Sequence, residues 1–268
     1  MLFQSLQITA LLLSGLIAQD APAPPTPTSP PPAQVDTDSK LPQDASVDQI
    51  LDALDQRGQN LKDFSASLTL KETRMDLGDS TSQKGVIQYQ RKPDASARIH
   101  VLFNSKRVGK KILDQKKEYL LDDGWVTDRD YDRKTEDRHQ VAKPGDKVDL
   151  FTLSGPFPLP IGQPRANVLK LFTVTKSPPA PTDPANTVHI TLTPRDGTEL
   201  AKKFKTIDVW VDTKSEMPKR INTTDAAETT QHQTDFDLKS INTGLKDADF
   251  TLDPIQGNWD RSTDKYVE

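Results

Sequence analysis

Hydrophobic residues recur at two different periods along this chain, first at helical spacing and then at every second position. Ser46 and Gln49 form a capping box, and the residues after it repeat at helical spacing to about Asn60. This pattern predicts an amphipathic helix as the first element of a folded domain. Its apolar positions are Val47, Ile50, Leu51, Leu54 and Leu61.

After this helix the period changes to two. From Phe64 to Lys71 apolar and polar residues alternate, which places one row on a buried face and the other in water. Short turns such as Asp123-Gly124 separate later segments of the same kind. We therefore expect a one-sided antiparallel meander that must curl or be covered to hide its apolar face. The later segments are Ile87 and Tyr89, Ile99 to Phe103, Tyr119 and Leu121, Val188 to Leu192, and Ile207 to Val211.

One region interrupts the alternation. Residues 151–173 read FTLSGPFPLPIGQPRANVLKLFT, which is apolar and broken by proline. We expect a loop and a short helix over the open face of the sheet. Such a cover either fills the core permanently, the commoner role of an apolar loop, or moves aside for an apolar ligand. Helical spacing returns after Pro164 in Ala166, Leu169, Lys170 and Phe172.

The first 45 residues differ in composition from the rest. The apolar run from about Ile8 to Ala18 is too short for a membrane span and is typical of a signal peptide, residues 1–18, with an uncleaved anchor as the alternative. Residues 19–45 are rich in proline, which predicts a disordered, solvated linker. The folded domain is then expected over residues 46–268, in a protein that is periplasmic or secreted.

Charge and composition argue against several classes of function. The net charge is -4 with both signs interspersed, so no basic field favours nucleic acid as a partner. The absence of cysteine excludes disulfides, thiol catalysis and thiolate metal sites. No nucleophile elbow or phosphate-binding glycine loop occurs, so we expect no catalytic residues and no cofactor. The histidines also lack metal-site spacing, and they are His100, His139, His189 and His232.

Three aspartates, Asp128, Asp130 and Asp132, alternate on one predicted strand face. A calcium loop that began with them would need glycine at its sixth place and glutamate at its twelfth, where the chain has Arg133 and His139. We therefore expect a solvated acidic strand face and no metal site.

The order of these segments resembles the outer-membrane lipoprotein carrier and lipoprotein-sorting family, the Lol carrier-like superfamily, from about Val47 to Trp259. The helix and the following DFSASLTLKET resemble the family's helix and first strand, and GVIQYQRKPDASARIHVLF its second and third strands. KKILDQKKEYLLDDGWV is similar to its next strand pair, and the tail from IDVWVDTK to DADFTLDPIQG to its last strands, with Phe250 near the end. Lys92 stands where the family has an arginine before the turn proline.

The resemblance implies a mainly β (α+β) fold, an incomplete antiparallel β-barrel with an N-terminal helix and a helical or loop lid over an apolar cavity. It also implies a monomeric carrier or chaperone for acyl chains of lipoproteins or other lipids. The alternative is an envelope sensor or protein-interaction module on the same scaffold, with an envelope protein as partner. The cavity residues expected from the alternation are Phe64, Leu68, Ile87, Tyr89, Ile99, Val101, Leu121, Ile190, Leu192, Val209 and Phe236, and the lid residues are Phe157, Ile161, Leu169 and Lys92.

Overall fold

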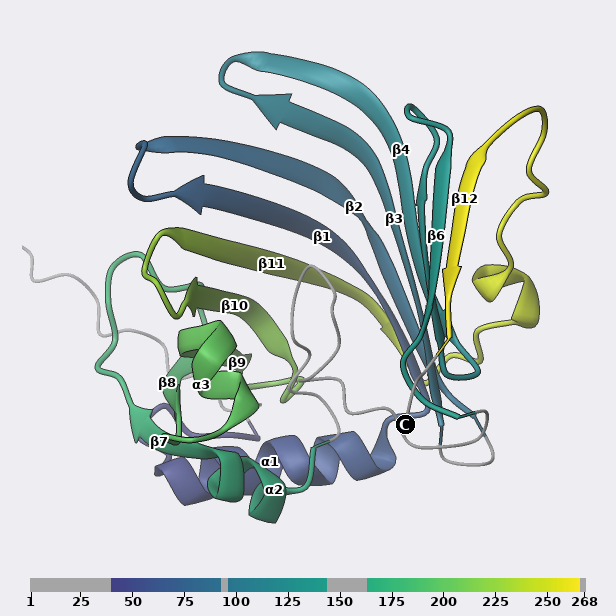
Figure 1. Cartoon of the computed structure of the whole chain (residues 1–268). Coiled ribbons are helices and arrows are strands. Elements are labelled where there is room, and N and C mark those ends of the chain that lie inside the picture. The colour runs from purple at the N-terminus through teal and green to yellow at the C-terminus, as the bar shows by residue number, and fades with distance from the viewer. Residues whose placement is uncertain (1–39, 93–95, 144–162, 266–268) are drawn as a thin grey trace, which may run out of the picture. The chain divides into compact units, whose positions relative to one another are not determined.

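In the computed structural model, the alternating segments form the strands of a single 12-stranded sheet (Figure 1). The structure describes residues 40–92, 96–143 and 163–265. The chain divides into two units, Met1–Thr37 and Asp38–Glu268, and every described residue belongs to the second. The predicted signal peptide and most of the predicted linker therefore lie outside the described residues.

The strand order shows how the meander is assembled. It runs β12-β6-β5-β4-β3-β2-β1-β11-β10-β9-β8-β7, so two meanders join where β1 pairs with β11. All neighbouring pairs are antiparallel except β12 with β6. The strands are β1 (Asp63–Arg74), β2 (Asp79–Arg91), β3 (Ala97–Val108), β4 (Lys111–Asp122), β5 (Trp125–Asp130), β6 (Thr135–Gln140), β7 (Phe172–Lys176), β8 (Thr187–Pro194), β9 (Phe204–Asp212), β10 (Pro218–Asp225), β11 (Thr230–Ile241) and β12 (Asp260–Asp264).

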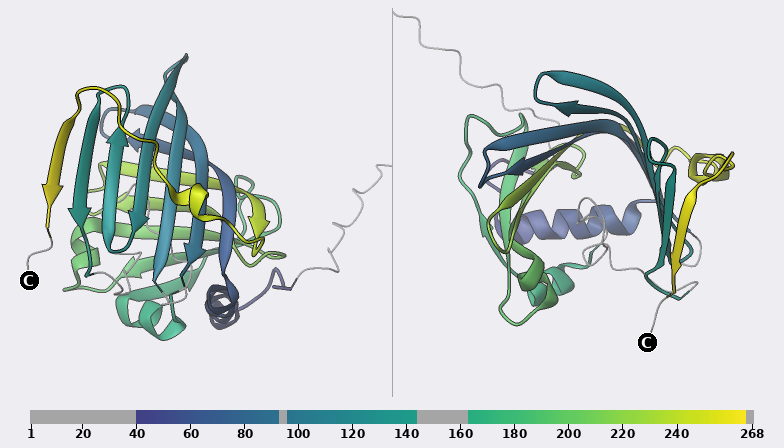
Figure 2. Two further views of the ribbon diagram at one scale, coloured as in Figure 1. Left: turned by 90° about the vertical axis from the view of Figure 1, so that its right-hand side faces the viewer. Right: turned by 45° about the horizontal axis from the view of Figure 1, so that its top comes forward.

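The sheet curves around its first helix. Figures 1 and 2 show α1 (Val47–Asn60) lying across the concave side of the sheet, which we call the inner face. The helix begins at the expected capping box, because Ser46 Oγ accepts from the backbone N–H of Gln49 at 3.2 Å and Gln49 Oε1 accepts from that of Ser46 at 2.8 Å. The other helices are α2 (Arg165–Leu171), α3 (Glu199–Lys203) and the 3-10 turn η1 (Asp247–Phe250).

Two local features of the sequence shape the strands. At the expected Asp123-Gly124 turn both residues have positive φ, 50° and 74°, the conformation of a tight two-residue hairpin. In β2 a bulge follows Lys84, and a Cβ at Gly85 would lie 2.1 Å from the carbonyl oxygen of Leu102. Only glycine allows this close approach, and the bulge increases the local bend of the sheet.

The fold class expected from the sequence is confirmed, since the described chain is mainly β and its sheet is open, with β7 and β12 at opposite edges. Two details differ from the sequence interpretation. Phe172 is the first residue of β7 and not part of the short helix α2, because its backbone pairs with Pro194 of β8. Leu41 is 3% exposed and its N–H donates to Thr213 O at 3.0 Å, so packing starts ahead of the expected domain start at Ser46.

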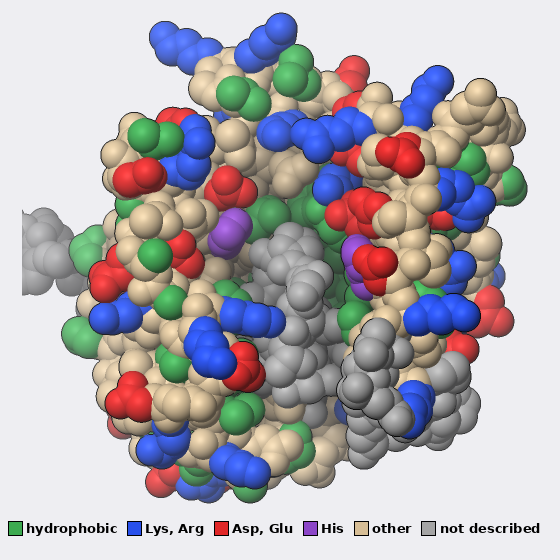
Figure 3. All heavy atoms as spheres, in the orientation of Figure 1, with side chains coloured by type: hydrophobic (Ala, Val, Ile, Leu, Met, Phe, Trp, Pro, Cys, Tyr) green, Lys and Arg blue, Asp and Glu red, His purple; other side chains and the backbone are tan. Residues whose placement is uncertain are grey.

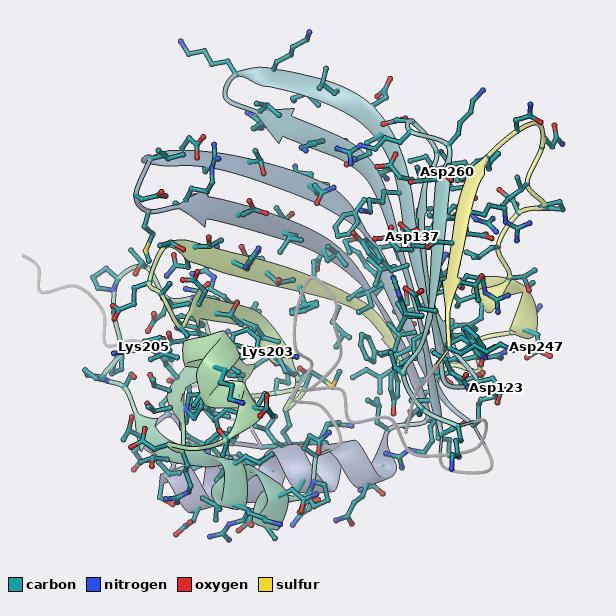
Figure 4. The ribbon with its side chains drawn as sticks, viewed as in Figure 1. Asp123, Asp137, Lys203, Lys205, Asp247 and Asp260 are labelled. Atoms are coloured by element: carbon teal, nitrogen blue, oxygen red, sulfur yellow. The ribbon has the colours of Figure 1, made fainter. Side chains whose placement is uncertain are left out.

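The C-terminal segment, residues 246–259, crosses the outer face of β3 to β6 (Figure 2, left). Arg98 of β3 binds Asp247 of η1 at 2.5 Å and lies 4.2 Å from the ring centroid of Phe250. His100 Nδ1 lies 2.9 Å from Asp249 O, so a ring N–H donates there. Figure 4 shows Asp247 at the η1 end of this segment and Asp260 at the start of β12. The segment thereby covers polar side chains on the outer face.

In the described ranges, none of the helices is long and apolar enough to cross a membrane.

Candidate functional site

The residues expected to line a cavity lie together on the inner face. The register pairs Phe64 with Tyr89, Ile87 with Val101, and Ile99 with Leu121, which brings one row of each strand to the same side. All are buried in one cluster except Phe236, which is half-buried and packs against that cluster. The alternation in the sequence therefore indicated the correct face. The buried residues are Phe64, Leu68, Ile87, Tyr89, Ile99, Val101, Leu121, Ile190, Leu192 and Val209.

Two apolar pockets open on this face among the described residues. The first lies between α1, α2 and strands β8 and β9, and the second between β1, β11 and the start of β10. Each has a cavity volume of about 10 Å³, which is room for roughly one water molecule. An acyl chain therefore needs more space than these two pockets offer. The first is lined by Leu51, Leu54, Gln163, Val168, Ile190, Leu192 and Val209, and the second by Phe64, Ala66, Met217, Pro218, Phe236 and Leu238.

The inner face extends beyond the part that the described helices cover. Several of its hydrophobic side chains are only half-buried although they pack against the core. Figure 3 shows hydrophobic side chains deep in this side of the molecule, framed by charged side chains near its edge. The inner face is thus a continuous apolar surface that the described helices cover only in part. The half-buried members are Tyr119, Val126, Leu169, Val174, Phe236, Leu238 and Ile241.

Sequence reasoning missed Leu238 and Met217. Leu238 continues the alternation of Phe236 on β11, so the signal was present, but a bulge next to it shifts the register with β1. Met217 stands in the turn between β9 and β10, where periodicity carries no information, and is 3% exposed because the turn folds back against the core.

The short helix α2 is held against α1 by one arginine. Arg165 Nη1 donates to Asp52 at 2.9 Å, Nη2 binds Asp48, and its backbone N–H donates to Asp55 at 3.0 Å. The three acidic residues lie at helical spacing on one side of α1. This spacing is the sequence pattern from which a contact with a basic residue could have been predicted. Leu169 of α2 is half-buried and packs against the core, and its role as a lid residue stays a prediction. Phe157 and Ile161 lie outside the described residues.

Lys92 connects the β2–β3 turn with the end of β4. Its Nζ donates to Asp122 Oδ1 at 2.8 Å, and its backbone N–H donates to Ser96 O at 2.9 Å. Both side chains of the ion pair remain about one third exposed, at 27% and 33%. A role of Lys92 in holding a cover stays a proposal.

The inner face becomes polar toward β5 and β6. Lys117 Nζ lies 3.3 Å from Asp128, whose partner across the β5–β6 pair is Asp137. Burial raises the pKa of the Asp128 carboxyl, and only part of this rise is offset by Lys117. The expectation of a solvated acidic face is wrong for Asp130, which is 8% exposed and accepts from the N–H groups of the following turn. The inner face therefore carries charged groups at this end.

No protein-family model matches the chain, and no curated protein matches it either. It is similar to the crystal structure of MucB, at 12% identity and a TM-score of 0.44, over 77% of this chain and 62% of that chain, so it spans less than two thirds of MucB. An uncharacterized conserved protein from Thermus thermophilus is 12% identical with a TM-score of 0.44, over 81% of this chain and 98% of that chain. A LolA superfamily protein from Nitrosomonas europaea is 13% identical with a TM-score of 0.33, over 78% and 98%.

The solved structures similar to the chain thus include a member of the superfamily that the sequence resembles.

Proposed function

We propose that this protein binds acyl chains of lipoproteins or other lipids on the inner face of its half-barrel and acts as a periplasmic or secreted carrier or chaperone rather than an enzyme. The observation that supports the proposal is the continuous apolar inner face, which extends past α1 to half-buried residues such as Phe236 and Leu238. An apolar surface of this extent, which the described helices cover only in part, is typical of a binding site.

The energetics of this surface suit an aliphatic chain. Each CH₂ group transferred from water to an apolar surface contributes about 0.8 kcal/mol, so a long acyl chain gains several kcal/mol even from partial coverage. The charged groups at Lys117 and Asp128 oppose the entry of hydrocarbon at the polar end. The chain is therefore expected to lie along β1, β11 and the strands that follow toward α1.

The proposal is tested on the chain that begins at Gln19, the expected product of cleavage after Ala18. Native mass spectrometry looks for lipids that co-purify, and a fluorescent fatty acid measures affinity. Phe236→Ser removes an apolar group from the inner face, and we expect it to weaken probe binding about tenfold. Asp237→Ser, at the next and outward-facing position of β11, is the matched control and should bind as the unchanged protein does.

Protein that is empty on purification and has no measurable affinity for the fatty acid would overturn the proposal. A co-purified protein that binds equally to both variants would instead support the interaction-module alternative.

A further inference from the structure

The turn between β3 and β4 carries an unusual combination of exposed side chains. Ile112 is 61% exposed, Val108 46% and Leu113 39%. Four cations stand among them without any acidic residue from Ser105 to Leu113. We call residues 106–113 the basic tip. Its cations are Lys106, Arg107, Lys110 and Lys111.

Among the described residues, no acidic side chain neutralises the charges of the basic tip. None of its four cations forms an ion pair with an acidic residue of the ranges that the structure describes. The chain as a whole has a net charge of -4, so this patch is opposite in sign to the molecule that carries it. The neighbouring β1–β2 turn also exposes Met75 and Leu77, but there Arg74 is paired with Asp79.

Cross-strand pairing mixes the two kinds of side chain. Val108 pairs with Lys111, and the next two pairs along the hairpin are Arg107 with Ile112 and Lys106 with Leu113. Successive pairs point to opposite faces of the hairpin, so apolar and cationic groups occur on both faces. Figure 1 places this turn at the end of the sheet far from α1, and Figure 3 shows Lys and Arg side chains projecting there.

We propose that the basic tip docks on an anionic lipid surface, with Val108, Ile112 and Leu113 inserted among the headgroups and the four cations bound to lipid phosphates. Insertion into an interface surrounds a hairpin tip from both faces, which suits apolar side chains on both faces. A protein partner would have to enclose the tip from two sides. Cations that border inserted apolar side chains are the combination that anionic bilayers bind.

This inference goes beyond acyl-chain binding and does not depend on it. Vesicle docking uses the outer end of one hairpin, whereas the proposed acyl site uses the inner face. The Phe236→Ser variant, altered on the inner face only, should therefore bind vesicles as the unchanged protein does.

The test is co-sedimentation of the chain that begins at Gln19 with vesicles, because the apolar segment before Ala18 would itself bind bilayers. Vesicles of phosphatidylcholine mixed with phosphatidylglycerol are compared with phosphatidylcholine alone, at about 0.1 M and about 1 M salt. We expect binding to the anionic vesicles, weak binding to the neutral ones, and a loss at high salt. The double substitution Lys110→Gln with Lys111→Gln should weaken binding at least tenfold, since each cation near such a surface contributes roughly a fivefold effect.

A matched control removes two charges elsewhere. Lys202 and Lys205 are paired with Glu199 and Glu228, and Figure 4 shows Lys205 near α3, away from the basic tip. Lys202→Gln with Lys205→Gln changes the net charge equally and should leave vesicle binding unchanged. A third variant, Ile112→Ser, should weaken binding about fivefold with all cations present.

Equal losses in the tip and control variants, or equal binding to neutral and anionic vesicles, would overturn the inference. The basic tip could instead bind an acidic polypeptide such as poly-glutamate and no anionic vesicles. This result would assign the basic tip to a protein partner and would also overturn the inference.

Discussion

Arg129 and Glu136 form an ion pair on the outer face of the sheet that is almost fully buried, with side-chain exposures of 8% and 3%. Arg129 Nε donates to Glu136 Oε2 at 3.0 Å, and its Nη1 donates to the carbonyl oxygen of Asp253 at 2.6 Å. The other oxygen of Glu136 accepts from Arg261 of β12 at 2.9 and 2.7 Å. One carboxylate and one guanidinium thus tie β5 and β6 to both the C-terminal segment and β12.

Removal of this carboxylate should destabilise the fold. Glu136→Ala leaves Arg129 buried without its charge partner, and we expect the free energy of unfolding to fall by about 3 kcal/mol. Urea unfolding followed by tryptophan fluorescence measures the change. Lys205→Ala breaks an exposed pair with Glu228, 3.3 Å apart, and should cost less than about 1 kcal/mol. Equal effects of the two substitutions would contradict the prediction.

The same site predicts a loss of stability in acid. Burial raises the pKa of the Glu136 carboxyl. Hydrogen bonds from Arg129 and Arg261 lower this pKa by more than burial raises it, so the net pKa lies below the ordinary value. A carboxyl whose pKa is lower in the folded than in the unfolded chain stabilises the fold above the unfolded pKa. This contribution is lost as the pH falls through the folded pKa.

We therefore expect the melting temperature to fall from about pH 5 downward. In Glu136→Gln, which has no carboxyl to protonate, the fall should be shallower. Melting curves between neutral and acidic pH check this, and parallel pH profiles for the two proteins would contradict it.

The bend in β2 depends on the absence of a side chain at Gly85. A Cβ there would meet the backbone oxygen of Leu102 at 2.1 Å, and backbone cannot move aside as a flexible side chain can. Gly85→Ala should lower the free energy of unfolding by about 3 kcal/mol. Val86→Ala, at the next and partly exposed position, should cost less than about 1 kcal/mol. Denaturant unfolding of both variants decides the matter, and a neutral Gly85→Ala would show that the sheet can straighten.

Lys92 offers a test of the cover that the family resemblance implies. Its ion pair with Asp122 is about one third exposed, so Lys92→Ala should lower the free energy of unfolding by less than about 1 kcal/mol. If Lys92 helps to hold the cover, the same change should raise the dissociation rate of a bound fatty-acid probe about threefold. Stopped-flow fluorescence measures this rate, with the exposed Lys62→Ala as control. Unchanged rates would show that Lys92 only joins the β2–β3 turn to β4.

Much of the fold could be predicted because its signals are local. The Ser46–Gln49 capping box marks the first residue of α1, and the helical spacing after it marks the buried side of that helix. The Asp123-Gly124 turn likewise predicts one hairpin. Alternation also assigned the inner-face residues, since the side-chain period of a strand is two. Leu238 is the last residue of the regular alternation on β11 before a bulge, and Met217 lies in a turn, where periodicity carries no information.

The sequence by itself therefore determined which segments are strands and which rows are apolar. Only the tertiary structure decided that β1 pairs with β11, that Arg165 holds α2 on α1, and that Glu136 is buried under Arg261, 125 residues away in the chain. Such contacts depend on how distant segments fold back on one another, and no short-range pattern encodes that. The tertiary structure also showed that the inner face is apolar at one end and charged at Lys117 and Asp128, because strands of different composition share one curved sheet.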